Sequence, residues 1–352
     1  MKVLVINPGS TSTKIAIYDK ETPIYTNLIN HSVDDLSHFH HVIDQLDYRL
    51  ELIHDTLEAA GYHISELDAV SARGGFTKPV VAGTYHIDEN VVDTMKHSPV
   101  FEHASNLGPL LAWELTKDNH VPAYFVDPVS VDELTEVARV TGFKGMERRS
   151  FFHALNHRST ARKAAEMLGK TYNSCNLIIA HMGGGVTTAA HHNGRAVEVF
   201  NLYDEGCFAM DRGGALPVHN LIDFCFSGMT KEEVIKTIST KAGVYSYLGT
   251  KDFKSVVDKA FDENDEDAML IFKAMAYQLA KNIGALGAVL HFDVDAIVLT
   301  GGMAHSDKLV EEISKYVKKI APIMVLAGEN EMLSLAQGAN RVLKGEEKAK
   351  VY

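Results

Sequence analysis

Three short turns rich in glycine and hydroxyl residues each follow a run of apolar residues, and they occupy residues 7–13, 183–188 and 301–302. Backbone amides in such turns can approach an anion closely, because glycine has no Cβ and successive N–H groups form a concave nest. Lys14 adds a cation just after the first turn. One such turn is equally well explained as a tight hairpin, but three favour phosphate binding. None matches the P-loop or the Rossmann fingerprint, so another nucleotide fold is expected.

Two arginines are each followed by a pair of glycines, in Arg73-Gly74-Gly75 and in Arg212-Gly213-Gly214. A guanidinium beside flexible backbone can place its fork on a carboxylate or on a transferring phosphoryl group. A solvated arginine in a surface turn is the alternative for either one alone, and the presence of both favours a binding role. Asp127 follows a short apolar run, where sites in α/β proteins gather, although an aspartate before Pro128 also suits an ordinary turn.

Several histidines stand in pairs or groups. His153 and His157 are four residues apart at the start of a predicted helix, a spacing that could hold a metal, but no HExxH pattern is present and phosphate contact or helix capping is favoured. Two other groups are expected at solvated surface positions: His38, His40 and His41, and the pair His191 and His192.

The composition describes an ordinary globular protein. At 352 residues, with 46% hydrophobic and 23% charged residues, the chain is long enough for two domains. The net charge of −12 opposes binding to nucleic acid or to an anionic membrane, and no apolar stretch is long enough for a membrane span. The three cysteines form no CxxC pair, which fits a reducing cytoplasm, and the first apolar run resembles a strand more than a signal peptide.

The elements that must position these residues can be predicted from periodicity and capping. Similar hairpins are expected at residues 3–18 and 177–190, which suggests two similar domains joined by a short hinge near residue 130. Thr230 and Glu233 form a capping box, and Ser306 caps a later helix. Other helices are predicted over residues 41–60, 106–117, 154–168 and 265–289, and a buried strand over residues 296–299.

Residues 5–14, Val-Ile-Asn-Pro-Gly-Ser-Thr-Ser-Thr-Lys, resemble the opening signature of the acetokinase family, and the order of motifs along the whole chain is similar to that of its butyrate kinase branch. The resemblance implies an α/β fold of two duplicated actin/Hsp70/sugar-kinase-like (ribonuclease H-like) domains around a nucleotide cleft. Residues 1–130 with the C-terminal helix 332–352 are the expected acid-kinase domain, and residues 131–331 the expected nucleotide-binding domain.

The resemblance also implies roles for individual residues. Catalytic roles are implied for Arg212, Asp127, His153 in Phe-His-Ala-Leu-Asn-His, and His103 in Phe101-Glu102-His103; Arg73, three places later than the family's first arginine, is expected to substitute for it. Phosphate or nucleotide contacts are implied for Asn7, Ser10, Ser12, Lys14, His181, Gly183, Gly184, Gly185, Gly301 and Gly302. A metal site is implied at Asn7, Asp127 and Glu331.

The implied reaction is ATP + butanoate ⇌ ADP + butanoyl phosphate with Mg²⁺, carried out by a homodimer or higher homo-oligomer. Two motifs depart from the acetate kinase pattern: FHALNH replaces FHG(T/S)xH and RGGALP replaces RSGDIDP, so polar groups are lost and an acyl chain larger than acetate is expected. Isobutyrate, propionate or acetate are the alternative acids. A nucleotide-gated binding protein is the alternative from another class; regulators of this fold add a basic DNA-binding module, which is not expected here.

Overall fold

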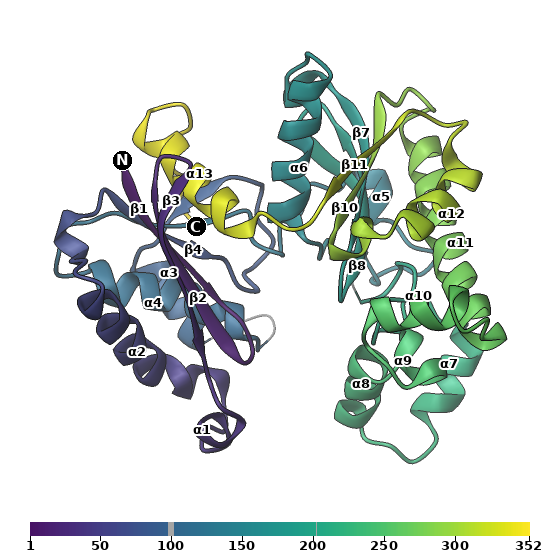
Figure 1. The fold of residues 1–352 in the computed structure, drawn as a ribbon, viewed down its shortest axis with the longest axis horizontal. Helices are drawn as coiled ribbons and strands as arrows, with labels where there is room; N and C mark the ends of the chain where they lie inside the picture. The colour runs from purple at the N-terminus through teal and green to yellow at the C-terminus, as the bar shows by residue number, and fades with distance from the viewer. Residues whose placement is uncertain (98–101, 202) are drawn as a thin grey trace. The chain divides into compact units, whose positions relative to one another are not determined.

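The computed structural model describes residues 1–97, 102–201 and 203–352 (Figure 1). Within these ranges the chain forms two compact units, one of Met1–Asp132 with Asn330–Tyr352 and one of Glu133–Glu329. Glu331 thus belongs to the first unit. The roles expected for the two units, acid binding and nucleotide binding, stay predictions.

The first unit is built on a six-stranded sheet in the order β3-β2-β1-β4-β6-β5. An antiparallel meander of β1, β2 and β3 is extended by β4 and β6, which run parallel to β1, and β5 closes the edge antiparallel to β6. The strands are β1 (Lys2–Pro8), β2 (Ser12–Asp19), β3 (Thr22–Asn30), β4 (Ala69–Arg73), β5 (Thr84–His86) and β6 (Ala123–Val126).

Helices cover both faces of this sheet. Val70 and Ala72 of β4 join the apolar core shared with α2 and α4, whereas Ser71 between them donates to the carbonyl oxygen of Leu335 in α13. Alternate residues of one strand therefore face different helices, as the pleat requires. The helices are α1 (Val33–Ser37), α2 (Leu46–Ala59), α3 (Glu89–His97), α4 (Leu107–Thr116) and α13 (Glu331–Leu343), with 3-10 turns at Val42–Gln45, Ile64–Glu66 and Ala104–Asn106.

The second unit repeats this arrangement with five strands in the order β11-β10-β7-β8-β9. The meander of β7, β8 and β9 is again antiparallel, and β10 and β11 continue the sheet parallel to β7. The strands are β7 (Asn176–Met182), β8 (Val186–His192), β9 (Arg195–Phe200), β10 (Ala296–Gly301) and β11 (Ile323–Ala327). The two predicted hairpins, β1–β2 and β7–β8, are confirmed.

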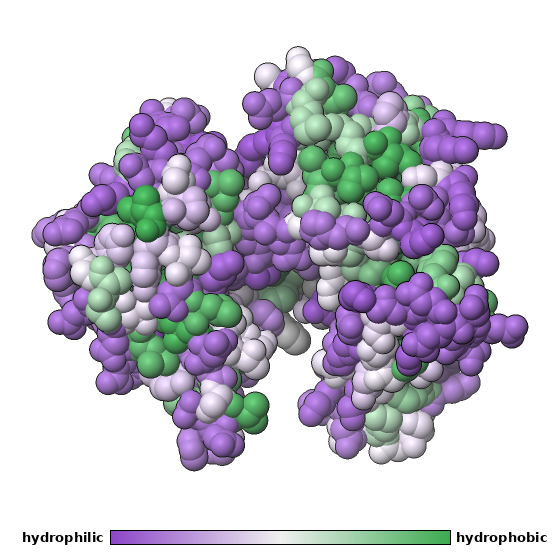
Figure 2. Space-filling view, viewed as in Figure 1, coloured by the Kyte–Doolittle hydropathy of each residue, from purple (hydrophilic) through white to green (hydrophobic). Residues whose placement is uncertain are grey.

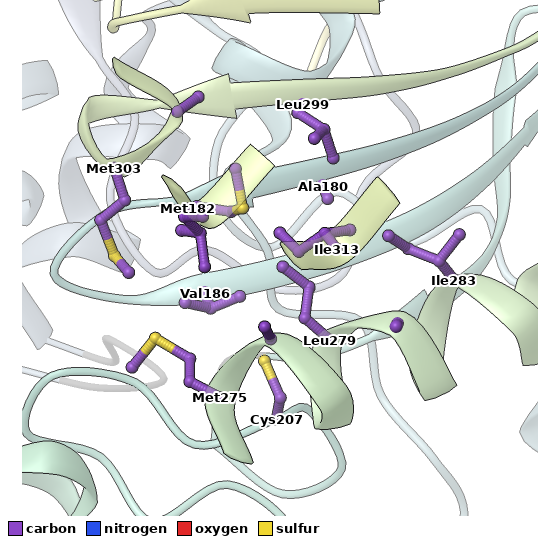
Figure 3. Packing of buried hydrophobic residues seen from close by; sticks show 14 of the residues in the cluster. Ala180, Met182, Val186, Cys207, Met275, Leu279, Ile283, Leu299, Met303 and Ile313 are labelled. Carbon is purple, nitrogen blue, oxygen red and sulfur yellow. The ribbon is translucent and has the colours of Figure 1, made fainter. Parts of the chain in front are cut away.

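The larger core of the second unit lies between its sheet and two helices. Leu279 and Ile283 of α11 and Ile313 of α12 pack with Ala180 and Leu299 of the sheet (Figure 3), and α6 covers the other face. The helices are α5 (Glu136–Arg139), α6 (Ala154–Met167), α7 (Val218–Cys225), α8 (Lys231–Thr240), α9 (Gly243–Leu248), α10 (Phe253–Phe261), α11 (Glu266–Val289) and α12 (Asp307–Val317), with 3-10 turns at Tyr172–Ser174 and Gly302–His305. Across the described residues, no helix combines the length and the apolar character needed to cross a membrane.

Local sequence signals predicted most helix ends correctly. Thr230 and Glu233 form the reciprocal capping box of α8, and Asp265 caps α11. Gly61, with φ of +73°, follows the end of α2. The start of that helix was predicted too early, at residue 41, because Val42–Gln45 forms a separate 3-10 turn before α2 begins at Leu46.

Candidate active site

Three predicted site residues of the first unit lie at one edge of its sheet. Asn7 is near the end of β1, Arg73 ends β4 and Asp127 follows β6. These three strands are parallel neighbours, so their carboxyl ends lie side by side. Ligand sites in open α/β sheets form at this edge, because backbone and side chains there are directed beyond the sheet.

Glu331 joins two of these residues, although it is far away in the sequence. Arg73 Nη1 donates to Glu331 Oε2 at 3.1 Å, and Asn7 Nδ2 donates to the same oxygen at 2.8 Å. Arg73 Nη1 also lies 3.4 Å from Asn7 Oδ1. Glu331 is the first residue of α13, and the ion pair is partly shielded, with 26% of the arginine and 16% of the glutamate side chain exposed. A cation, an amide and a carboxylate that already contact each other could exchange these contacts for a phosphoryl group and a metal.

Asp127 is held rigidly. It is 2% exposed, its Oδ1 accepts from the Gly83 amide at 2.7 Å, and its own amide donates to the Gly83 carbonyl at 3.0 Å. Its φ of +38° is uncommon for a residue other than glycine. Such backbone outliers cluster at functional sites, where surrounding contacts over-determine them.

The first glycine-hydroxyl turn is exposed at its tip. Gly9 donates to the Ser12 carbonyl at 2.7 Å and closes the turn, Ser10 and Lys14 are exposed, and Ser12 is half-buried. These side chains are accessible to a ligand, and the phosphate contacts implied for them stay predictions.

Arg49 of α2 supports this turn from inside, and the sequence analysis missed it. Its guanidinium is 1% exposed and donates to the carbonyl oxygens of Gly9, Ser10 and Ser12 at 2.9, 3.2 and 3.3 Å and to Thr13 Oγ1 at 3.0 Å. Burial lowers the pKa of Arg49 to about 10, so it stays charged at neutral pH. Because the carbonyl oxygens of the turn point to this cation, they do not repel an anion at the tip.

His103 has a structural contact in the first unit. Its Nδ1 accepts from the Ser105 amide at 3.1 Å and so caps the turn Ala104–Asn106, and its ring meets Phe76 edge to face at 5.6 Å. Phe101, the first residue of its motif, lies outside the described residues. The catalytic role implied for His103 stays a prediction.

In the second unit, the second glycine-rich turn lies against the third. Gly183 donates to the Gly185 carbonyl at 3.0 Å, and Gly184 is exposed. Gly301 has φ of +87°, and a Cβ on it would lie 2.4 Å from the Met182 carbonyl oxygen. Glycine is therefore required for β10 to end so close to the β7–β8 hairpin.

A cavity of about 460 Å³ opens beside Gly302. Its lining combines apolar side chains with a few polar ones, which is typical of small-molecule pockets of this size. The lining residues are Asp252, Phe253, Lys254, Val257, Gly302, Met303, His305 and Ser306. The loop predicted to contact the nucleoside thus borders a pocket in its own unit.

The structure brings His153 and His181 together. His153 precedes α6, and its ring stacks on His181 with 3.9 Å between the ring centroids. His153 Nδ1 lies 2.9 Å from Thr187 Oγ1. The Nδ1 atom of His181 lies 2.9 Å from Asn156 Oδ1, and its Nε2 atom lies 3.1 Å from Glu329 Oε1.

Arg212 is held in a loop by backbone contacts. Its carbonyl oxygen accepts from the Ala209 amide at 3.0 Å, and its guanidinium lies 5.6 Å from the centre of the Tyr203 ring. Its Nη1 is buried and has no hydrogen-bond partner in the part of the chain that the structure describes. A buried donor of this kind is costly unless a ligand accepts from it, so Arg212 is suited to bind an anion.

Comparison with known protein families and proteins shows which family this chain resembles over most of its length. The model of the acetokinase family matches residues 140–351. Butyrate kinase 1 of Clostridium acetobutylicum is 47% identical over 353 residues, which cover all of this chain and 99% of that protein. The chain belongs to the acetokinase family.

Two solved structures of related kinases share the fold. Acetate kinase of Porphyromonas gingivalis aligns with a TM-score of 0.80 at 20% identity, covering 97% of this chain and 99% of that one. A propionate kinase of Francisella tularensis aligns with a TM-score of 0.78 at 17% identity, covering 96% of this chain and 98% of that one. The predicted α/β class with two duplicated domains of the actin, Hsp70 and sugar-kinase type is therefore confirmed for this acetokinase family member. The individual site residues stay predictions.

One expectation about the histidines was wrong. His191 was expected on the surface, but it is fully buried on β8, where its Nε2 lies 3.3 Å from His157 Nδ1. Successive strand residues face opposite sides of the sheet, so of the neighbouring pair only His192 is exposed. His38, His40 and His41 are exposed, as predicted.

The residues suggested for Mg²⁺ fit its chemistry. Asn7, Asp127 and Glu331 offer the oxygen ligands that this hard cation prefers. Over residues 1–97, 102–201 and 203–352, no group of three or more His, Cys, Asp or Glu side chains is placed to hold a metal ion. Mg²⁺ commonly binds through one or two carboxylates, water and substrate phosphates, so it does not require such a group.

Proposed function

We propose that this chain is a butyrate kinase that transfers the γ-phosphoryl group of ATP to butanoate and forms ADP and butanoyl phosphate, with the reverse reaction making ATP. The full-length 47% identity to Butyrate kinase 1 carries the proposal. The departures FHALNH and RGGALP favour an acid larger than acetate, because they remove polar side chains from motifs near the predicted acid site. Isobutyrate, propionate and acetate are the alternative substrates.

The chemistry requires cations and oriented donors more than it requires a base. A carboxylate is ionised at neutral pH and can attack directly, so the barrier lies in bringing two anions together and holding the phosphoryl group in line. In this proposal Arg73, Arg212 and His153 neutralise the phosphoryl oxygens, and the amides of the two glycine-rich hairpins bind phosphate. Asn7, Asp127 and Glu331 would hold Mg²⁺, which supplies charge neutralisation on the ATP phosphates.

The second unit is the proposed site of the nucleotide. The pocket beside Gly302 offers Phe253, Val257 and Met303 as apolar contacts for a flat base, and polar groups at its margin. Gly301 and Gly302 would let the nucleotide approach the backbone closely.

We propose that the enzyme is at least a dimer. The edge strand β11 reads Ile-Met-Val-Leu-Ala, none of its residues is fully buried, and Val325 is 44% exposed. Figure 2 shows hydrophobic surface (green) at this strand. An uncovered apolar edge strand favours pairing with another chain, and a second copy is the simplest partner.

A cytoplasmic location is proposed because Cys175, Cys207 and Cys225 are all free thiols.

A hydroxamate assay for acyl phosphate tests the function. Purified protein would be incubated with ATP, Mg²⁺ and acetate, propionate, butyrate, isobutyrate or valerate in turn. Activity that peaks at four carbons supports the proposal, and Arg212→Ala should lower it by about 10²-fold or more. A peak at two or three carbons would favour an acetate or propionate kinase. Absence of acyl phosphate from every acid, with ATP still bound, would favour the nucleotide-gated binding protein.

A further inference from the structure

The chain that follows α13 in the first unit returns along β5 and contacts its backbone. The Lys350 amide donates to the Thr84 carbonyl at 2.8 Å, and the His86 amide donates to the Lys350 carbonyl at 2.9 Å. Glu347 Oε1 accepts from the Thr84 amide at 2.8 Å. We call residues 347–350 the return segment. It lies along one edge of β5, and β6 pairs with the other edge.

One peptide bond at the start of β5 joins the return segment to Asp127. Its carbonyl, which belongs to Gly83, accepts from the Asp127 amide at 3.0 Å, and its N–H, which belongs to Thr84, donates to Glu347 Oε1 at 2.8 Å. The peptide is trans, so its C=O and N–H point in opposite directions within one plane. A rotation of this plane would break both bonds. Glu347 therefore fixes the carbonyl that holds the Asp127 backbone.

The conformation of Asp127 needs such support. Its φ of +38° lies in a region that residues other than glycine keep only where the surrounding contacts over-determine it. Gly83 supplies two of these contacts, because its carbonyl accepts from the Asp127 amide and its own amide donates to Asp127 Oδ1 at 2.7 Å. A displacement of Gly83 would therefore release the backbone of Asp127 and the direction of its carboxylate together.

Glu347 is itself held in place. Arg341 Nε of α13 donates to its second oxygen, Oε2, at 2.8 Å, and only 20% of each of these two side chains is exposed. The return segment also fills the space beside Gly83, where a Cβ would lie 2.6 Å from Lys350 Cε and 3.1 Å from Glu347 Oε1. Gly83 is thus enclosed between the return segment and Asp127.

We propose that Glu347 is a positioning residue for Asp127 and that it acts through the peptide bond between Gly83 and Thr84. The carboxylate of Asp127 is then directed before a ligand binds at the edge of the sheet. A charged group whose direction is set in advance acts on the reacting atoms without reorganisation. The catalytic part of this role rests on the proposed kinase function, whereas the effect of Glu347 on the contacts of Gly83 does not.

The amide signal of Gly83 in NMR spectra reports whether Asp127 is held. Labelling with [¹⁵N]glycine and [1-¹³C]alanine selects the glycines that follow alanine, which are Gly61, Gly83, Gly243 and Gly328. Asp127→Asn identifies Gly83 among them, because it removes the charge of the acceptor. We expect Glu347→Ala to move this signal, and Glu347→Gln, which keeps one oxygen acceptor, to move it less. Glu346→Ala, at the exposed neighbouring position, should leave it unchanged.

Kinetics supply the second readout. Glu347→Ala should lower kcat about tenfold or more, since loss of a partner that orients a metal-binding carboxylate typically costs about 10–100-fold. In protein that already carries Asp127→Asn, the same substitution should lower kcat by no more than about twofold, because the effects of residues that act as a unit do not add. Circular dichroism melts show which variants fold. Glu347→Gln, with smaller effects in the same directions, replaces Glu347→Ala if the latter does not fold.

Three results would decide against the role of Glu347 or against part of it. A Gly83 signal that is identical in the unchanged protein and in folded Glu347→Ala would overturn the proposal, as would equal losses of kcat with and without Asp127→Asn. A signal that moves without any change in kcat would reject the positioning role in the reaction. If the unchanged protein phosphorylates no acid, the proposed function fails, and the Gly83 signal still decides whether Glu347 holds Asp127.

Discussion

Arg49 Nη1 donates to the carbonyl oxygen of Gly9 over 2.9 Å, from a guanidinium that is almost completely buried. The same side chain contacts the carbonyl oxygens of Ser10 and Ser12. One cation therefore fixes the backbone of the first hairpin, whose tip remains exposed.

Replacing Arg49 should damage both stability and phosphate binding. Arg49→Met removes the guanidinium that donates to the partly buried carbonyl oxygens of Gly9, Ser10 and Ser12, so we expect a loss of about 3 kcal/mol in the free energy of unfolding and weaker binding of ADP. Arg49→Lys keeps the charge but loses the forked set of donors, so its free energy of unfolding and its ADP affinity should lie between those of the unchanged protein and those of Arg49→Met. Urea unfolding and calorimetric titration measure these effects, with Arg149→Met as an exposed control. Unchanged ADP affinity in a folded Arg49→Met would contradict the positioning role.

The contact between Arg73 and Glu331 should be needed for turnover. Arg73→Ala removes a cation from the sheet edge, and Glu331→Gln removes a carboxylate that could hold Mg²⁺. We expect kcat to fall on the order of 10²-fold for Arg73→Ala, and the Mg²⁺ concentration for half-maximal activity to rise for Glu331→Gln. Glu346→Gln, exposed in the same unit, is the control. An unaltered Mg²⁺ dependence in Glu331→Gln would remove this residue from the proposed metal site.

Two adjacent glycines should respond differently to substitution. A Cβ at Gly301 would collide with the Met182 carbonyl and require a strained backbone, whereas a Cβ at Gly302 meets nothing within 4 Å. We expect Gly301→Ala to cost at least about 2 kcal/mol and Gly302→Ala to cost little, measured by urea unfolding. Equal losses in both variants would show that the close approach of β10 to the hairpin is not maintained in solution.

The buried histidines predict how stability depends on pH. Their native pKa values are lowered, to about 3 for His191 and about 4 for His31, so below pH 6.5 the unfolded chain binds protons that the native protein does not. These histidines make their full contribution to the free energy of unfolding above pH 6.5. That contribution falls as the pH drops below 6.5, by about 1.4 kcal/mol per pH unit for each such histidine. His191→Gln should reduce this slope between pH 6.5 and 5, and His192→Gln should not. Equal slopes in these two variants would mean that the pKa of His191 is not lowered in the native protein.

The edge strand β11 should control assembly. Val325→Lys places a charge on an apolar edge, so we expect it to reduce the mass in solution, measured by light scattering after size exclusion. Val33→Lys, exposed in α1, is the control. An unchanged oligomer in Val325→Lys would locate the interface elsewhere.

The sequence by itself determined the local structure and the family. The capping box of Thr230 and Glu233 and the glycine at residue 61 are short-range signals, and they correctly marked the ends of helices. The strand–turn–strand patterns predicted both hairpins, because alternation and turn residues are also local. The signature of residues 5–14 indicated the acetokinase family, which the comparisons confirmed.

Only the tertiary structure decided which distant side chains meet. Arg73 and Glu331 are 258 positions apart, and no periodicity relates them. His191 looked like its exposed neighbour His192, and only the packing of β8 separated them. Arg49 did leave a signal, since a charged residue interrupts the apolar face of Leu46, Ile53 and Leu57, but its partners became visible only in the fold. Local patterns fix backbone conformation through short-range hydrogen bonds and sterics, whereas contacts between remote residues depend on how whole elements pack.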